Sequence, residues 1–99
     1  MNLEPRDALL IRAERAYRDV VADPRKARPL AEAIADEARR AGAHEALTIA
    51  LRAAGWAARE LYDHTAARRL LNEATHVARR NGLDDRLCEA LITRSATYL

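Results

Sequence analysis

Cysteine, glycine, proline and aromatic residues are all scarce in this chain. Among its 99 residues phenylalanine is absent, and glycine and proline number three each. A single cysteine, Cys88, excludes an intramolecular disulfide and any zinc site built from several cysteines. No apolar run is long enough to cross a membrane, and the N-terminal residues lack the charged and apolar segments of a signal peptide. We therefore expect a cytoplasmic protein without a membrane partner.

An excess of one charge is also missing. The net charge is only +2, because fifteen acidic residues are interspersed among seventeen basic ones. All the basic residues except Lys26 are arginine, a bias that is typical of a GC-rich bacterial genome. Proteins that bind nucleic acid usually concentrate positive charge on one stripe, so nucleic acid is the least favoured partner. Alanine and arginine dominate the composition, and both favour helices over strands.

The signatures of catalysis and cofactor binding are absent as well. There is no glycine-rich phosphate loop, no G-x-S-x-G motif and no convincing carboxylate pair. His44, His64 and His76 do not have the spacing of zinc ligands. We expect Cys88 to lie on the apolar side of the last helix as a small buried residue rather than a nucleophile. The sequence therefore predicts no enzyme, no cofactor and no metal.

What the chain does have is an internal repeat of about forty residues. A shift of forty residues superimposes identical glycine, aspartate and leucine residues: Gly42 on Gly82, Asp23 on Asp63, Leu30 on Leu70, and Leu51 on Leu91. We interpret residues 1–99 as one domain with units at about 4–42 and 43–82 and a half-unit at 83–99.

Apolar residues recur in each unit at three- and four-residue steps, which is typical of amphipathic helices. Asp23 and Asp63 are placed to cap helix starts, and Gly42 and Gly82 to end helices in the left-handed conformation. We expect Pro29 to kink its helix or delay its start. The predicted helices cover about 5–21, 24–41, 44–61, 64–81 and 84–99. The connections are short, so neighbouring helices should run antiparallel.

Residues 55–78 resemble a tetratricopeptide repeat. Gly55 takes the family's small position in the first helix of the pair, and Ala67, Leu71 and Ala74 take the alanine and large-residue positions of the second. The long period is similar to repeats in large bacterial regulatory proteins, including those that precede CHAT-type protease domains. The resemblance implies an all-α fold of antiparallel hairpins stacked in a short right-handed solenoid. It implies no protease activity, because the catalytic residues of a CHAT domain have no counterpart here.

The resemblance also implies a concave groove, lined by the first helix of each pair, that holds a peptide. The residues it would place there are Arg12, Asp19, Ile49, Arg52, Trp56 and Arg59. Three guanidinium groups around one tryptophan suit an acidic or C-terminal carboxylate. Two alternatives stay open. Arg12 and Arg52 are also interpretable as solvated partners of nearby acids, and Trp56 as a core residue between repeats.

We therefore expect a non-catalytic module that binds a peptide or protein, either as an adaptor or as a scaffold segment of a larger regulatory protein. One alternative is a structural module that forms homo-oligomers through the last helix, where Leu87, Leu91 and Tyr98 have no partner helix after them. A second alternative is a helical module that binds nucleic acid.

Overall fold

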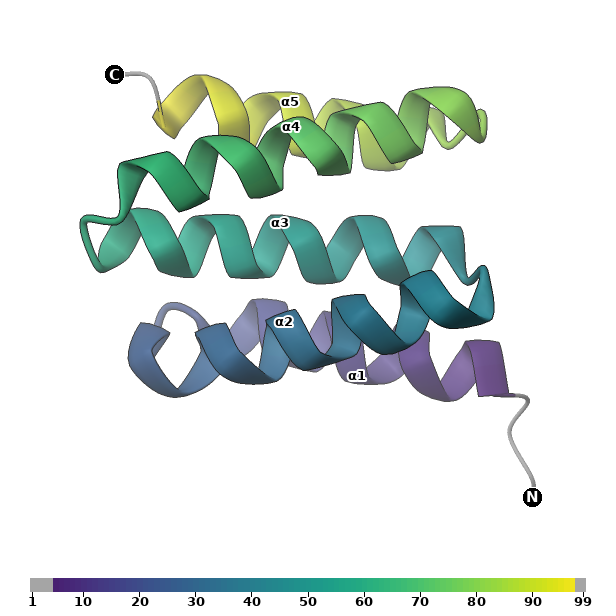
Figure 1. Ribbon diagram of the computed structural model, residues 1–99, viewed down its shortest axis with the longest axis horizontal. Coiled ribbons are helices and arrows are strands. Elements are labelled where there is room, and N and C mark those ends of the chain that lie inside the picture. Colours follow the sequence, from purple (N-terminus) through teal and green to yellow (C-terminus); the bar gives the residue numbers. More distant parts are fainter. Residues whose placement is uncertain (1–4, 98–99) are drawn as a thin grey trace.

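The computed structural model describes residues 5–97, and within that range all regular secondary structure is helical. The five helices are α1 (Pro5–Asp19), α2 (Pro24–Ala41), α3 (His44–Glu60), α4 (His64–Arg80) and α5 (Asp84–Thr97), shown in Figure 1. The predicted all-helical fold is confirmed, and every helix begins at the predicted residue. Tyr98 lies outside the described residues.

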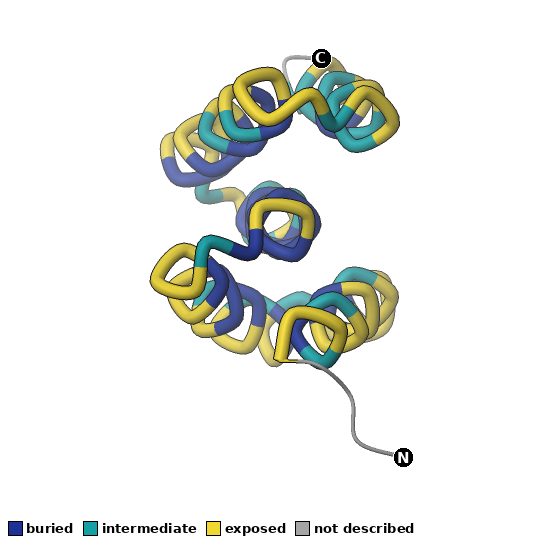
Figure 2. Tube along the Cα trace, turned by 90° about the vertical axis from the view of Figure 1, so that its right-hand side faces the viewer, coloured by how far each residue is buried: buried dark blue, intermediate teal, exposed yellow. Residues whose placement is uncertain are grey.

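Helix α3 is the centre of the molecule. It packs against α1, α2, α4 and α5, whereas α1 does not pack against α5 and the backbones of α2 and α4 stay apart. Consecutive helices run antiparallel (Figure 1). Seen along the helix axes, α2 and α4 lie on one side of α3, and α1 and α5 lie on the other (Figure 2). Each face of the molecule therefore has two outer helices with α3 between them.

The predicted signals at the helix ends are confirmed. The Asp23 carboxylate accepts a hydrogen bond from the backbone N–H of Lys26, and the Asp63 carboxylate accepts one from Ala66, both at 3.2 Å. Gly42 and Gly82 adopt the left-handed conformation, with φ of 67° and 66°. These groups satisfy backbone atoms that a helix end would otherwise leave without partners.

Two backbone features of the described residues are unusual for helices and their turns. Helix α2 starts at Pro24 and runs on through Pro29, so the start is not delayed. Tyr62, in the turn after α3, is the one non-glycine residue of the described range with positive φ, at 63°. The N–H of Asp63 donates to the Ala58 carbonyl at 2.8 Å and closes α3 around this residue. A side chain in this conformation costs about 1 kcal/mol or more.

The core consists mainly of alanine, which lets the helices approach closely. Eleven residues of α3 are buried, against two in α5, Ala90 and Thr93. Leu51 and Leu71 are the largest of the side chains that are completely covered. Leu87 and Leu91 are half-buried.

The expectation that Cys88 is buried is wrong, because the side chain is exposed. Helix α5 packs only against α3 and α4, and neither of these helices covers the Cys88 side chain. A periodic pattern identifies the less polar side of a helix, but burial also requires a neighbour that covers it.

Candidate partner-binding groove

Two hollows lie along α1, and residues of α3 line both of them. One, of about 290 Å³, is lined by Glu14, Tyr17, Arg18, Ile49, Arg52, Arg86 and Glu89. The other, of about 360 Å³, lies between the start of α1, the start of α3 and the turn before α5, with Arg6, Leu10, His44 and Leu83 among its lining residues. We call the two hollows together the α1–α5 groove.

Arg52, on α3, contacts both α1 and α5 in the middle of this groove. Its side chain is 17% exposed. Nε donates a hydrogen bond to Thr93 Oγ1 at 2.8 Å, and an Nη donates to Glu89 Oε2 at 3.3 Å. The guanidinium carbon lies 4.2 Å from the centre of the Tyr17 ring, within the range of a cation–π interaction. Arg52 thus connects the floor of the groove to both walls.

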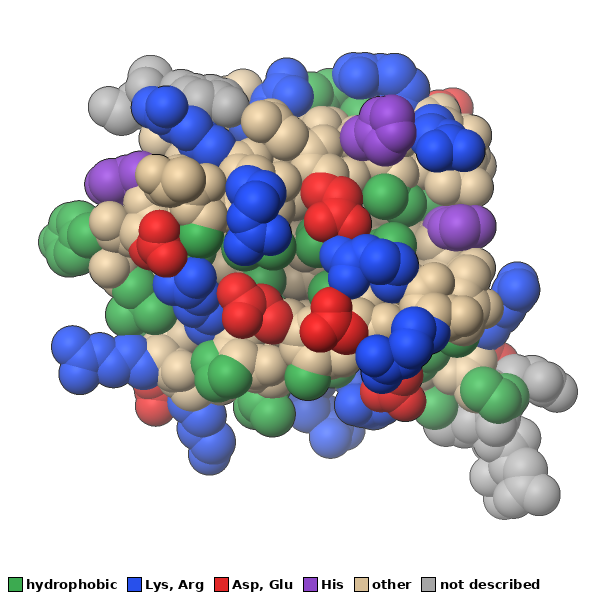
Figure 3. All heavy atoms as spheres, in the orientation of Figure 1, with side chains coloured by type: hydrophobic (Ala, Val, Ile, Leu, Met, Phe, Trp, Pro, Cys, Tyr) green, Lys and Arg blue, Asp and Glu red, His purple; other side chains and the backbone are tan. Residues whose placement is uncertain are grey.

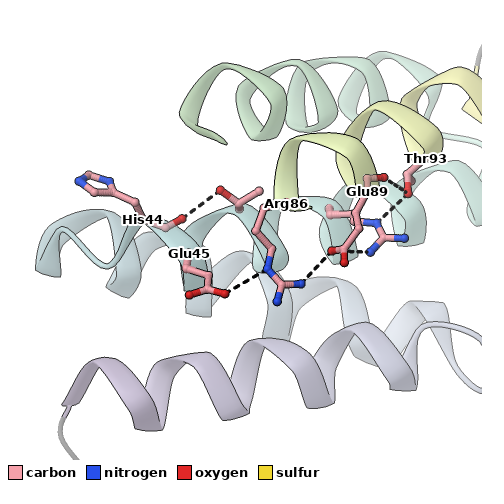
Figure 4. Close-up of polar contacts among 7 residues, drawn as sticks. His44, Glu45, Arg86, Glu89 and Thr93 are labelled. Carbon is pink, nitrogen blue, oxygen red and sulfur yellow. Dashed lines mark hydrogen bonds and ion pairs between the residues drawn. The ribbon is translucent and has the colours of Figure 1, made fainter. Parts of the chain in front are cut away.

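Arg86 adds a second link between α5 and α3. Its guanidinium group donates to Glu45 Oε1 at 3.1 Å and to Glu89 Oε2 at 2.9 Å, as Figure 4 shows. Burial disfavours the charge, but the hydrogen bonds and charges of Glu89 and Glu45 outweigh it and raise the pKa of Arg86 above its ordinary value. Glu89 therefore accepts from two arginines, and the wall formed by α5 is fixed by charged hydrogen bonds.

An aromatic pair extends from Tyr17, which lines the groove, toward the C-terminal end of α3. The rings of Tyr17 and Trp56 lie 5.2 Å apart at 47°, and the guanidinium carbon of Arg59 lies 6.0 Å from the Trp56 ring. Trp56 Nε1 donates to Glu60 Oε1 at 3.0 Å. Hydrogen bonds from Arg59 and then Trp56 lower the pKa of the Glu60 carboxyl. Trp56 is half-buried and packs against the core, as the alternative interpretation of a core residue expected in part, and it lines neither hollow of the groove.

The predicted site residues fall into two groups. Arg52, Trp56 and Arg59 form one strip with Tyr17, and Ile49 lies buried in the floor.

Arg12 and Asp19 lie elsewhere. Arg12 turns to α2, where it bonds to Glu37 at 2.8 Å, as the alternative interpretation of a solvated pair expected. Asp19 lines a separate hollow at the turn between α1 and α2. Sequence reasoning missed Tyr17 and Arg86. Tyr17 is the one aromatic residue of the first predicted helix, which was a usable signal, whereas the pairing of Arg86 with Glu45 had none.

The opposite face, formed by α2 and α4, carries side chains of both signs (Figure 3). Arg28 pairs with Asp63 at 3.0 Å, and Arg39 pairs with Glu73 at 2.7 Å. In each pair the positive and negative charges neutralise each other, so this face has no large patch of one sign among these residues. Within residues 5–97, no three side chains of the metal-binding types gather, and no helix is both long and apolar enough to cross a membrane.

Comparisons of the chain with protein-family models, with curated proteins and with solved structures each return no match.

Proposed function

We propose that the chain is a non-catalytic protein-interaction module, a short right-handed solenoid of the tetratricopeptide type whose α1–α5 groove binds a peptide segment of a partner protein. The observation that carries the proposal is the groove itself, which has one wall on each of two helices that do not pack against each other. We place this activity in the cytoplasm, as an adaptor or as the scaffold segment of a regulatory protein.

The charges of the groove divide into two kinds. Arg52, Arg86 and Glu89 bond to one another or to the walls and hold the walls in position. Glu14 and Arg18, both on α1, are exposed and make no ion pair within the described residues. The first kind preorganises the groove, and the second remains available to a ligand. A bound peptide would place a basic residue near Glu14, an acidic residue near Arg18 and an apolar one over Tyr17.

The test is a selection of random-sequence displayed peptides on the immobilised chain. We expect the selected peptides to lose about tenfold or more in affinity for the double variant Glu14→Lys, Arg18→Glu. The Glu14 and Arg18 side chains are exposed and form no ion pair within the described residues, so the helix content of the double variant should not change. Arg15→Glu is the matched control, since Arg15 is exposed on α1 and lines neither hollow. Peptides that bind the double variant as tightly as the wild type would contradict the proposal.

A further inference from the structure

The internal repeat shows what kind of neighbour fits the outer edge of α5. In α3, a stripe of one leucine flanked by two smaller residues, Thr48, Leu51 and Gly55, runs along one side of the helix, and all three are buried. Leu71 of α4 comes so close to Gly55 that a β-carbon there would lie 2.7 Å from its Cγ. In the second unit, therefore, α4 packs against the side of α3 that carries this stripe.

The same pattern returns forty residues later on α5, as Cys88, Leu91 and Ser95. Here Cys88 and Ser95 are exposed and Leu91 is half-buried, because α5 packs only against α3 and α4. Ile92, 68% exposed, borders the stripe. The positions of the α3 stripe thus recur in the third unit, with the same leucine and two small residues, without a helix on them.

A charged group recurs in the same way. Arg39, near the end of α2, reaches Glu73 of α4 with two hydrogen bonds, of 2.7 and 3.2 Å. Its counterpart near the end of α4 is Arg79, which is exposed and forms no ion pair within residues 5–97. A helix that lay on the α5 stripe would meet Arg79 as α4 meets Arg39.

We propose that the stripe Cys88–Leu91–Ser95, with Arg79 beside it, is a docking site for an amphipathic helix of the α4 kind. Such a helix carries leucine flanked by small residues on its apolar side and a carboxylate at the position of Glu73. The occupant is a helix of another protein rather than a helix of a second copy. In a second copy, both helices of this kind are already packed between two neighbours, α2 between α1 and α3, and α4 between α3 and α5.

Cys88 provides a reporter for the test. Its counterpart Thr48 is 1% exposed, so a docked helix should cover the Cys88 thiol. The probe is a synthetic peptide with the sequence of residues 64–80, and the readout is the rate at which iodoacetamide alkylates Cys88 in the full chain. We expect saturable protection. The peptide of residues 24–41 is the matched control, because it has Ala31 and Ala33 at the positions of Leu71 and Glu73, and it should protect less.

Two variants locate the site. Leu91→Glu should weaken the protection by about tenfold or more. Arg79→Glu should weaken it about two- to fivefold, and a peptide with Glu73→Arg should restore it. Ile11→Glu, on an exposed position of α1, should leave it unchanged. Protection that survives Leu91→Glu would overturn the assignment. These variants leave the α1–α5 groove intact, so failure here is distinct from failure of the proposed function.

A second measurement removes the dependence on an isolated peptide, since a helix of this length is marginally stable in water. A second copy of residues 60–80 appended after Leu99 continues the repeat in register. We expect a higher unfolding temperature and a protected Cys88, and no protection when the appended copy carries Leu71→Glu. A reactive Cys88 with both the peptide and the appended helix would overturn the proposal. So would protection that rises with protein concentration alone, because a second copy would then be the occupant.

Discussion

At the scale of single residues, the closest approach between two helices occurs at Gly55. A β-carbon at this position would lie 2.7 Å from Leu71 Cγ and 2.9 Å from Cδ2, and Leu71 is itself completely buried. Overpacking a core typically costs about 1–3 kcal/mol, whereas alanine gains about 1 kcal/mol over glycine within a helix. We expect Gly55→Ala to lower the free energy of unfolding by up to about 2 kcal/mol, measured by urea denaturation.

The control uses a double-mutant cycle with Leu71→Ala, which removes the two crowded carbon atoms. In that background only the helix preference remains, so Gly55→Ala should stabilise the protein by about 1 kcal/mol. The same sign in both backgrounds would show that the close approach does not restrict this position.

Asp63 links stability to acid pH. The backbone amide of Ala66 and then Arg28 hold the pKa of its carboxyl below the usual range. A carboxyl whose pKa is lower in the folded state stabilises the protein above its unfolded pKa of about 4, and this stabilisation is lost as the pH falls through the folded pKa. We expect Asp63→Asn, which keeps the capping oxygen, to flatten the decline of stability with pH below about pH 4. Thermal unfolding of both proteins at a series of pH values measures this dependence of stability on pH.

Asp85→Asn is the matched control for this series. Asp85 is exposed and forms no ion pair or side-chain hydrogen bond within the described residues, and the change alters the net charge by the same amount. An equal effect of both variants would show that net charge rather than the Asp63 contacts governs the acid behaviour.

At the scale of helices, the starts of α2 and α4 were predictable because each rests on local chemistry. Asp23 and Asp63 accept from the amides that a capping residue normally satisfies, and Gly42 and Gly82 adopt the positive φ that glycine allows. The left-handed Tyr62 was not predictable from local preference. The hydrogen bond from the Asp63 N–H to the Ala58 carbonyl fixes the turn. Tyr62 therefore adopts positive φ although this conformation is strained for a residue with a side chain.

Within the described residues, Pro29 is the one proline that lies beyond the first turn of a helix. It lies in the second turn of α2, is exposed, and has no N–H to donate to the carbonyl of Arg25. We expect Pro29→Ala to raise the free energy of unfolding by about 2 kcal/mol. Alanine gains about 3 kcal/mol from its higher helix preference, and part of this gain is lost because the unfolded chain has more conformational entropy without the proline. Pro24→Ala is the control: Pro24 occupies the first helical position, where a missing N–H costs nothing, so no gain is expected. Circular dichroism melts compare the two variants.

At the scale of the whole molecule, the sequence identified the helices but not which side chains meet between them. Arg12 and Arg52 occupy equivalent positions of the repeat, yet Arg12 pairs with Glu37 of α2 while Arg52 pairs with Glu89 of α5. The difference arises because α3 lies between two units and α1 lies at an edge. Position within the repeat array, which no single repeat encodes, therefore decides which of the two arginines lies in the groove.

The same difference predicts an uneven stability along the chain. Since α5 buries two residues and α3 buries eleven, the amides of α5 should exchange with solvent faster than those of α3. Glu89→Gln removes the charge that Arg52 and Arg86 share, and we expect it to speed exchange in α5 about fivefold. Glu37→Gln, which deprives only Arg12 of its partner, should leave α5 unchanged. Native-state hydrogen exchange distinguishes the two.

The placement of α5 has one further consequence. This helix is at once a wall of the α1–α5 groove and the bearer of the Cys88–Leu91–Ser95 stripe, and it is the least buried helix. We expect occupancy of either surface to order the same helix, so that the entropy lost on the first binding event is not lost again on the second. The two ligands should therefore bind with positive cooperativity, and by thermodynamic reciprocity each would strengthen the other by the same factor. A segment that docks behind α5 would thus regulate the groove in front of it without touching the peptide.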